Sequence, residues 1–128
     1  MSLPFLVLAD DDEDDRFLFS QAILLVDPSI VCSMVGNGRE VMTLLSSDFL
    51  SLPDFIFLDL NMPLMNGREC LAAIRQHPGY NSCVVIIYST TMEAEEEAGL
   101  KAAGAADCLV KPTGKHELAA LLRKCCGL

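Results

Sequence analysis

Five short apolar runs alternate with longer segments of helical character along the whole chain. No internal repeat and no Gly/Ser-rich linker interrupts this alternation. Continuously apolar runs are typical of strands that are buried on both faces, and strands that alternate with helices form a parallel sheet. The predicted strands are residues 5–9, 30–35, 55–58, 83–88 and 107–110.

The segments between these runs carry apolar residues at the spacing of one helix face. Right-handed crossovers place such helices on both faces of the sheet, which predicts a doubly wound, three-layer α/β sandwich. The segment 93–103 differs, because Leu100 is its one large apolar side chain among acidic residues and alanines. We therefore expect it to be the least firmly docked helix. The apolar stripes of the other segments are Leu18, Ala22 and Leu25; Val41, Leu44 and Leu45; Leu71 and Ile74; and Leu118, Leu121, Leu122 and Cys125.

Composition limits the function classes that such a fold can serve. The chain has 128 residues, of which 52% are hydrophobic, and this suits a single domain, 1–128, with one core. Its 9 Lys and Arg against 18 Asp and Glu give a formal net charge of −9, which repels nucleic acid and acidic membrane surfaces. No apolar stretch approaches the ~18 residues of a membrane span. We expect a soluble protein with no nucleic-acid and no membrane partner.

The 6 cysteines show no C-x-x-C spacing, and the 2 histidines are too few to complete a zinc cluster with them. Most of these cysteines lie in apolar runs, where a free thiol packs as a small hydrophobic group, and no secretory signal precedes them. A reducing compartment fits this usage, so we predict a cytoplasmic protein. The adjacent Cys125 and Cys126 are interpreted as inert, and His77 and His116 as exposed.

Ionisable and hydroxyl side chains gather at the carboxyl ends of the predicted strands. In open α/β sheets this edge binds ligands, at the point where the strand order reverses. We therefore predict that three carboxylates, a hydroxyl and an ammonium share one cleft. The residues that follow the first, third, fourth and fifth strands are Asp10 and Asp11, Asp59, Ser89 and Thr90, and Lys111.

Such a cleft needs protons or a cation, because two carboxylates about 4 Å apart repel by roughly 4 kcal/mol at an effective dielectric constant near 20. Oxygen ligands favour a hard divalent ion, and Mg²⁺ fits because it takes one or two carboxylates together with phosphate oxygens and water. Asp59, alone after the middle strand, is then the predicted nucleophile for a phosphoryl group, while the pair Asp10 and Asp11 holds the metal. Ser89 and Lys111 bind the phosphoryl oxygens.

Four segments carry a resemblance to a known family: 5–12 (FLVLADDD), 57–67 (FLDLNMPLMNG), 86–90 (IIYST) and 104–112 (GAADCLVKP). Over essentially its whole length, the chain resembles a response-regulator receiver domain of two-component signalling. The resemblance implies a flavodoxin-like, five-stranded parallel sheet in the order 2-1-3-4-5. It also implies that Asp59 accepts a phosphoryl group from a histidine kinase or a phosphotransfer protein. The implied ligands of Mg²⁺ are Asp10, Asp11, Asp59 and the backbone carbonyl of Asn61.

The resemblance further implies a signalling switch and not an enzyme that turns over substrate. Ser89 matches the family's hydroxyl by its offset from Lys111, and Thr90 takes the neighbouring position. The Lys111–Pro112 bond is a candidate cis peptide. Phosphorylation is expected to change the surface of the fourth helix, fifth strand and fifth helix. A downstream protein reads this surface, and the chain is a monomer or a weak dimer.

Some features of the chain depart from the family pattern. Cys108 stands where many relatives have an aromatic residue that swings inward, so activation here is expected to depend on Ser89 and on repacking of helices and loops. The segment 46–53 is longer than usual, and we expect it on the surface opposite the output face. No DNA-binding or catalytic segment follows the last helix, which predicts output through protein contact or a domain cut from a longer protein.

Two local motifs that resemble ligand-binding loops are interpreted as ordinary turns and helix starts. Residues 12–15 fit an acidic first helical turn, with Asp14 and Asp15 solvated. A calcium loop fails, because Asp15 and Gln21 stand where Gly and Glu are required. The sequence Gly-Asn-Gly at 36–38 lacks the third Gly of a dinucleotide loop and is interpreted as a turn and helix start.

Two other functions compete with the phosphoacceptor hypothesis. An aspartate-dependent phosphatase of the haloacid dehalogenase type shares the chemistry, but it has an acid two residues after the nucleophile, where this chain has Asn61. A receiver-like module that only binds is disfavoured by the presence of Asp11, Asp59 and Lys111 together.

Overall fold

The computed structural model describes residues 2–47 and 51–128. In these residues, strands and helices alternate along the chain, with one short 3₁₀ helix, η1 (Pro78–Tyr80). The strands are β1 (Phe5–Ala9), β2 (Val31–Val35), β3 (Phe55–Leu58), β4 (Val84–Ser89) and β5 (Asp107–Val110). The α-helices are α1 (Glu13–Val26), α2 (Gly38–Leu45), α3 (Gly67–Gln76), α4 (Ala94–Ala102) and α5 (Lys115–Cys126).

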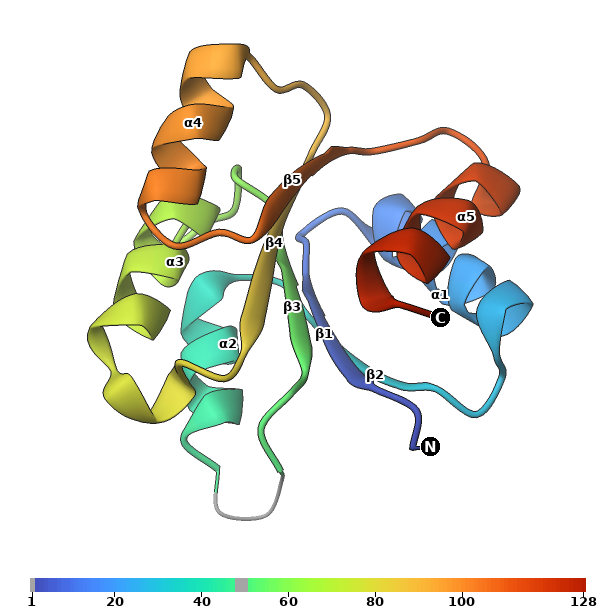
Figure 1. Cartoon of the computed structure of the whole chain (residues 1–128), viewed down its shortest axis with the longest axis horizontal. Helices are drawn as coiled ribbons and strands as arrows, with labels where there is room; N and C mark the ends of the chain where they lie inside the picture. Colours follow the sequence, from blue (N-terminus) through green and yellow to red (C-terminus); the bar gives the residue numbers. More distant parts are fainter. Residues whose placement is uncertain (1, 48–50) are drawn as a thin grey trace.

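The strands form one parallel sheet in the order β2-β1-β3-β4-β5. Helices α1 and α5 cover one face of the sheet, while α2, α3 and α4 cover the other (Figure 1). The predicted three-layer, doubly wound fold and its strand order are therefore confirmed. The order reverses between β1 and β3, which is where this type of sheet opens a cleft at the carboxyl ends of its strands.

The register of the two central strands places two aspartates side by side. Ala9, the last residue of β1, pairs with Leu58, the last residue of β3. Asp10 and Asp59 therefore leave the sheet at the same level. The backbone N–H of Asp59 donates to the carbonyl of Ala9 at 3.0 Å, which fixes this level.

The end of β4 differs slightly from the sequence-based expectation and places Ser89 in the sheet. The N–H of Cys83 donates to the carbonyl of Tyr80 in a turn at 3.1 Å, so β4 begins one residue later than predicted. Ser89 is then the last residue of the strand, and its carbonyl accepts the N–H of Lys111 at 2.7 Å. Ser89 and Lys111 therefore lie beside each other at the same edge as the aspartates.

The start of β2 and the Lys111–Pro112 bond differ from the sequence-based expectations. β2 begins at Val31 because the N–H of Ile30 donates to the carbonyl of Asp27 in a turn. The Lys111–Pro112 bond is trans, since no peptide bond between described residues is cis, so the expectation of a cis bond was wrong. The trans form is also the one that an X–Pro bond favours by about 0.5–1 kcal/mol. The expected insertion 46–53 includes 48–50, which lie outside the described residues.

The two faces of the sheet carry separate apolar layers. On the α1 and α5 face, Phe19 packs edge-on against Phe57 and Tyr88, with ring centroids 5.2 Å and 5.7 Å apart. On the other face, aliphatic side chains from the sheet meet α2 and α3. Helix α4 contributes one buried side chain, Leu100, and this is the feature from which weak docking of the helix is predicted.

Candidate functional site

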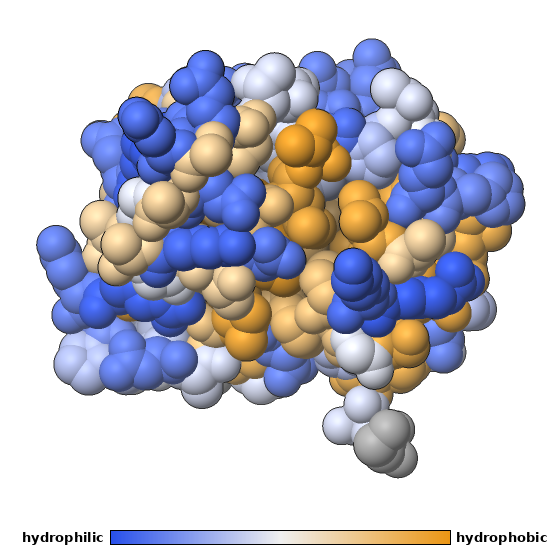
Figure 2. Space-filling model, turned by 45° about the horizontal axis from the view of Figure 1, so that its top comes forward, coloured by the Kyte–Doolittle hydropathy of each residue, from blue (hydrophilic) through white to orange (hydrophobic). Residues whose placement is uncertain are grey.

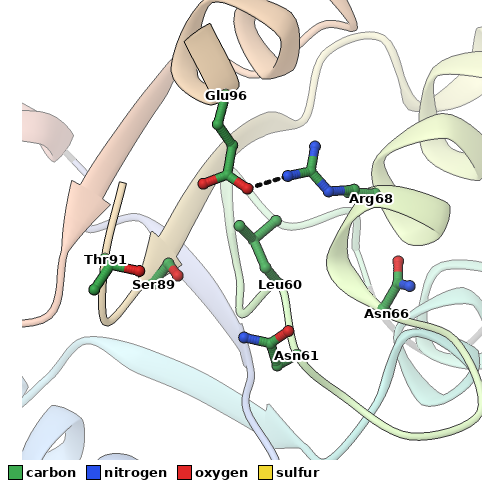
Figure 3. Close-up of a pocket in the computed structure, with 7 residues that line it drawn as sticks. All are labelled: Leu60, Asn61, Asn66, Arg68, Ser89, Thr91 and Glu96. Atoms are coloured by element: carbon green, nitrogen blue, oxygen red, sulfur yellow. Dashed lines mark hydrogen bonds and ion pairs between the residues drawn. The ribbon is translucent and has the colours of Figure 1, made fainter. Parts of the chain in front are cut away.

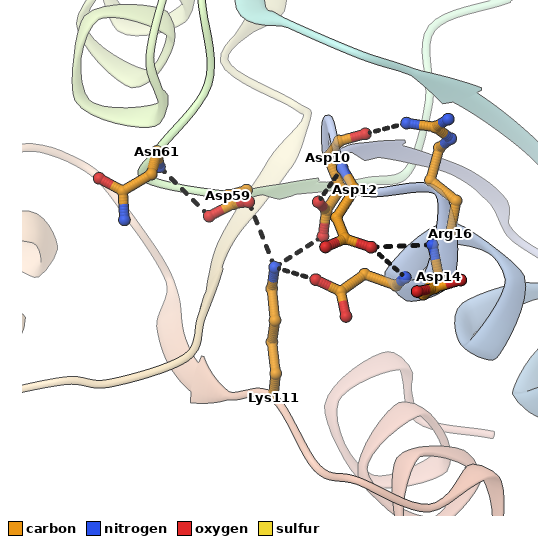
Figure 4. A network of polar contacts seen from close by, with 8 residues as sticks. Asp10, Asp12, Asp14, Arg16, Asp59, Asn61 and Lys111 are labelled. Atoms are coloured by element: carbon orange, nitrogen blue, oxygen red, sulfur yellow. Dashed lines mark hydrogen bonds and ion pairs between the residues drawn. The ribbon is translucent and has the colours of Figure 1, made fainter.

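The strand ends bring the predicted site residues into one cleft. The side chain of Asp10 is fully buried, and Asp59 and Ser89 are 6% and 3% exposed. Lys111 extends from the end of β5 across the cleft toward Asp59 and Asp10 (Figure 4). Asp11, next to Asp10, is exposed at the mouth of the cleft. Charged groups this deeply buried need partners, because burial without compensation costs several kcal/mol.

Lys111 supplies that compensation for several carboxylates at once. Its Nζ lies 2.8 Å from Oδ2 of Asp10, 2.8 Å from Oδ2 of Asp15 and 3.2 Å from Oδ2 of Asp59. The ammonium also lies over the ring of Tyr88, 5.4 Å from its centroid, at a distance typical of cation–π contacts. The side chain of Lys111 is only 7% exposed, so solvent screens these contacts little.

Asp15 was expected to be solvated, and the structure corrects this expectation. Asp12 caps α1, and its carboxylate accepts the backbone N–H groups of Asp14 and Asp15. This fixes the first turn of α1, from which the Asp15 side chain reaches Lys111. Asp14 has no side-chain hydrogen bond or ion pair with another described residue, so the prediction of a solvated position holds for Asp14 only.

Burial and charge shift the pKa values of the ionisable groups in the cleft. Burial raises the pKa of Asp10 to about 6, and Lys111 only partly opposes this rise, while the neighbouring charge of Asp59 adds to it. Burial acts to lower the pKa of Lys111, but the carboxylates of Asp10 and Asp15 outweigh it and raise that pKa. Lys111 therefore stays protonated, and the cleft keeps more negative than positive charge.

The carboxylates fit a divalent cation. One oxygen each from Asp10, Asp11 and Asp59 lies within 4.8 Å of the others. Oδ2 of Asp10 is buried and has no hydrogen bond of acceptable geometry among the described residues, although Nζ of Lys111 is close. A buried acceptor with spare capacity, in a set of oxygen donors only, suits Mg²⁺ or a similar hard ion. Asn61, the fourth predicted ligand, donates its N–H to Oδ1 of Asp59 at 3.2 Å.

On the other side of the cleft, Ser89 faces a small cavity of about 160 Å³ (Figure 3). The cavity lies between the loop after β3 and the start of α4. An ion pair between Arg68 of α3 and Glu96 of α4 spans it. Thr90 instead lines a hollow on the Lys111 side. The cavity is lined by Leu60, Asn61, Asn66, Arg68, Ser89, Thr91 and Glu96.

The loop after Asp59 is held by a glycine whose role the sequence did not reveal. A Cβ on Gly67 would lie 2.3 Å from the backbone oxygen of Asp59, closer than any side chain permits. The absence of that atom lets α3 begin directly beneath the loop. Asn66 and Glu69 form a capping box at the same helix start. Gly67 therefore allows the start of α3 to lie in close contact with the backbone of Asp59.

Cys108 of β5 is half-buried and packs against the apolar layer on the α2, α3 and α4 face. The six cysteines are free in the structure.

His77 stacks on Tyr80 with ring centroids 4.1 Å apart, and both histidines are exposed as predicted. Among the described residues, no helix combines the length and apolar character that crossing a membrane requires.

A family model for the response regulator receiver domain matches residues 6–123. The chain belongs to this family. It is a receiver domain, a signalling switch of the kind used in two-component systems, as the resemblance implied. Receiver domains interact with histidine kinases or phosphotransfer proteins, and they bind Mg²⁺ or Mn²⁺ at an acidic pocket.

Related proteins differ in length and architecture. The chain is 29% identical over 122 residues to an uncharacterized 14.6 kDa protein of Leptolyngbya boryana, covering 94% of this receiver domain and 88% of that protein. It is 31% identical over 118 residues to the DNA-binding transcriptional regulator NtrC of Salmonella typhimurium, covering 91% of this chain but 24% of the regulator. The receiver domain therefore spans about a quarter of the length of NtrC.

Solved structures agree on the fold. The chemotaxis response regulator CheY4 of Vibrio cholerae is 26% identical, with a TM-score of 0.82 over 96% of this chain and 98% of that one. The Mn²⁺-bound form of response regulator Rcp1 is 20% identical, with a TM-score of 0.83 over 94% of this chain and 92% of Rcp1. At the latter identity the likeness shows the fold, so the chemistry must be argued from the residues of the cleft.

Proposed function

We propose that this receiver domain is a phosphoacceptor in a two-component phosphorelay and that Asp59 is the residue phosphorylated. The observation that carries the proposal is the position of Asp59. Its carboxylate lies beside two further aspartates, 3.2 Å from the ammonium of Lys111, with Ser89 on the adjacent strand end. A structural aspartate needs one partner, whereas this one lies among a full set of phosphoryl-binding groups.

The proposed reaction is an in-line transfer to a carboxylate oxygen. An oxygen of Asp59 attacks the phosphorus of a phosphohistidine on the kinase or phosphotransfer protein, and a new O–P bond forms. The P–N bond breaks, and its electron pair stays on the imidazole, which then takes up a proton. The ammonium of Lys111 and the hydroxyl of Ser89 donate to phosphoryl oxygens, where negative charge concentrates.

We propose Asp10, Asp11, Asp59 and the backbone carbonyl of Asn61 as the protein ligands of Mg²⁺. When bound, Mg²⁺ supplies positive charge that offsets the carboxylates and the incoming phosphoryl group. The protein ligands orient the acceptor. The buried Asp10 is held by the N–H of Asp12 on its Oδ1 at 3.0 Å, which leaves Oδ2 facing the cleft.

Output is proposed to pass through the surface of α4, β5 and α5 to a downstream protein. Figure 2 shows a strip of hydrophobic surface between more hydrophilic regions on the α4 and α5 sides. Val110 of β5, 51% exposed, supports an apolar contact there. Since Cys108 lacks an aromatic ring, we propose that Ser89 and repacking of α4 transmit the change. We further propose one domain, 1–128, that acts in the cytoplasm as a monomer or weak dimer.

Intact-mass spectrometry with a small acyl phosphate as donor tests the proposal. Wild-type protein with Mg²⁺ should gain one phosphoryl group, and Asp59→Asn should gain none. Chelation of Mg²⁺ should suppress the gain, while Asp14→Asn, which removes a nearby solvated charge, should leave it intact. No gain by the wild type, or an equal gain by Asp59→Asn, contradicts the proposal. Steady turnover of a generic phosphomonoester would instead assign a phosphatase.

A further inference from the structure

Asp15 makes a contact that phosphoryl transfer to Asp59 does not require. Its Oδ2 lies 2.8 Å from Nζ of Lys111, closer than the 3.2 Å between Nζ and Asp59. Asp15 belongs to the first turn of α1 and Lys111 follows β5, 96 positions later in the sequence. This ion pair therefore joins α1 to the start of the β5–α5 loop, at the edge of the cleft.

The ammonium of Lys111 already donates to two carboxylates, those of Asp15 and Asp59. It carries three N–H groups, and three carboxylates, those of Asp10, Asp15 and Asp59, lie within 3.2 Å of it. A phosphoryl group on Asp59 adds three strong acceptor oxygens within reach of the same ammonium. The phosphoryl group and the carboxylates must therefore compete for Lys111.

Of the neighbours of Lys111, Asp15 can leave at the lowest cost. Asp10 is fully buried, and one of its oxygens already accepts the N–H of Asp12. The side chain of Asp15 is 30% exposed and borders a hollow of about 440 Å³ that is open to solvent. Its carboxylate can turn to water, which replaces the lost contact, whereas a buried carboxylate would be left without compensation.

We propose that Asp15 is the counter-ion of Lys111 in the unphosphorylated domain and competes with the phosphoryl group for it. This inference rests on the proposed function of Asp59. Asp15 is a positioning residue, since it acts through Lys111. Its contact with the ammonium withdraws a donor from the phosphoryl group, and this weakens the phosphorylated state. Release of Asp15 also detaches the first turn of α1 from the β5–α5 loop.

Binding of fluoroberyllate, a phosphoryl mimic, in the presence of Mg²⁺ measures this competition without turnover. By titration calorimetry, Asp15→Asn should bind the mimic about three- to tenfold more tightly than the wild type, because a neutral amide competes weakly for an ammonium. Asp14→Asn removes the same charge one position earlier, where no contact with Lys111 exists, and should change affinity less than about twofold. Asp15→Glu, which keeps a carboxylate, should restore affinity close to that of the wild type.

A double-mutant cycle with Lys111 shows whether the effect of Asp15 on binding of the mimic passes through Lys111. In a Lys111→Gln background, Asp15→Asn should change the affinity for the mimic no more than Asp14→Asn does. Equal effects of Asp15→Asn and Asp14→Asn in the wild-type background, or weaker binding by Asp15→Asn, overturn the role of Asp15. If the wild type is phosphorylated at Asp59 in the acyl phosphate assay, the proposed function survives that result. If the wild type gains no phosphoryl group, both proposals fail.

Discussion

The two sides of the cleft differ in the contacts that hold them in place. On the α1 side, Lys111 is 7% exposed, lies among carboxylates and rests on Tyr88, which packs against Phe19 in the core. On the α4 side, one buried side chain, Leu100, anchors the helix. The first side is held by burial and charge together, and the second mainly by a single apolar contact.

This difference separates two tasks. The buried side holds the charged groups at fixed distances, which suits chemistry at Asp59. The α4 side has little apolar contact to lose, so it can shift at low cost, and low local stability is typical of elements that move in switching. Ser89 lies between the two sides and faces the cavity beneath α4. A change at Ser89 is therefore expected to be transmitted through α4 and not through α1.

The largest predicted difference concerns the two apolar anchors. Phe19→Ala should lower the free energy of unfolding by about 3–5 kcal/mol, because it opens a cavity under Tyr88 in the core. Leu100→Ala should cost less globally, about 2–3 kcal/mol, and should raise hydrogen exchange in α4 more than in α1 or α5. Denaturant melts and exchange mass spectrometry measure the two effects. A uniform rise in exchange after Leu100→Ala would show that α4 is as firmly held as the other helices.

The second prediction tests the buried charges of the α1 side through pH. The pKa of Asp10 is raised to about 6 in the folded domain, above the value of 3.8 for an unshifted aspartate. Between these values the folded state binds more protons than the unfolded state, so stability falls as pH rises from about 4 to 6. The loss should be about 2–3 kcal/mol in metal-free buffer and should then level off.

Asp10→Asn serves as the matched variant for this measurement. An amide has nothing to titrate, so the decline between pH 4 and 6 should flatten in this variant. Chemical denaturation across the pH range, in the presence of a chelator, gives the free energies directly. A wild-type domain that gains stability over the same window would show that Lys111 compensates the burial of Asp10 in full.

Much of the fold and part of the site follow from sequence pattern alone, for a physical reason. Buried parallel strands need continuous apolar runs, and their carboxyl ends meet at one edge, so residues that follow such runs are brought together by topology. Asp10, Asp59 and Lys111 were identified in this way. The predicted starts of two strands were one residue too early, at Ile30 and Cys83. The backbone N–H groups of these residues donate within turns, and apolar composition cannot distinguish them from N–H groups that pair between strands.

The remaining features depend on contacts that no local pattern encodes. Asp15 appears in the sequence as one more acidic residue of a helix start, and only the packing of α1 beside β5 turns it toward Lys111. Gly67 matters because a helix start passes close to the backbone of Asp59. Its position before a capped helix, with the segment Asn66-Gly67 following Pro63, is the nearest sequence signal, and it indicates a turn but not the contact.

The smallest predicted effect concerns the ion pair that joins α4 to α3. Arg68 and Glu96 are both partly exposed, so their coupling should be about 0.5 kcal/mol. Glu97 provides a control on the same helix, because it pairs with Lys101 one turn later at 2.9 Å and makes no ion pair with α3 among the described residues. A double-mutant cycle of Arg68→Gln with Glu96→Gln should show this coupling, and the cycle of Arg68→Gln with Glu97→Gln should show none.

Hydrogen exchange in α4 can also be compared between the unphosphorylated and the phosphorylated domain. If the cross-helix pair helps to hold α4, Glu96→Gln should raise exchange in that helix by about twofold in the unphosphorylated domain. Glu97→Gln weakens the helix internally and should act in both states alike. A zero coupling between Arg68 and Glu96 would leave Leu100 as the anchor of α4, and it would make the contrast between the two sides of the cleft sharper than the structure alone indicates.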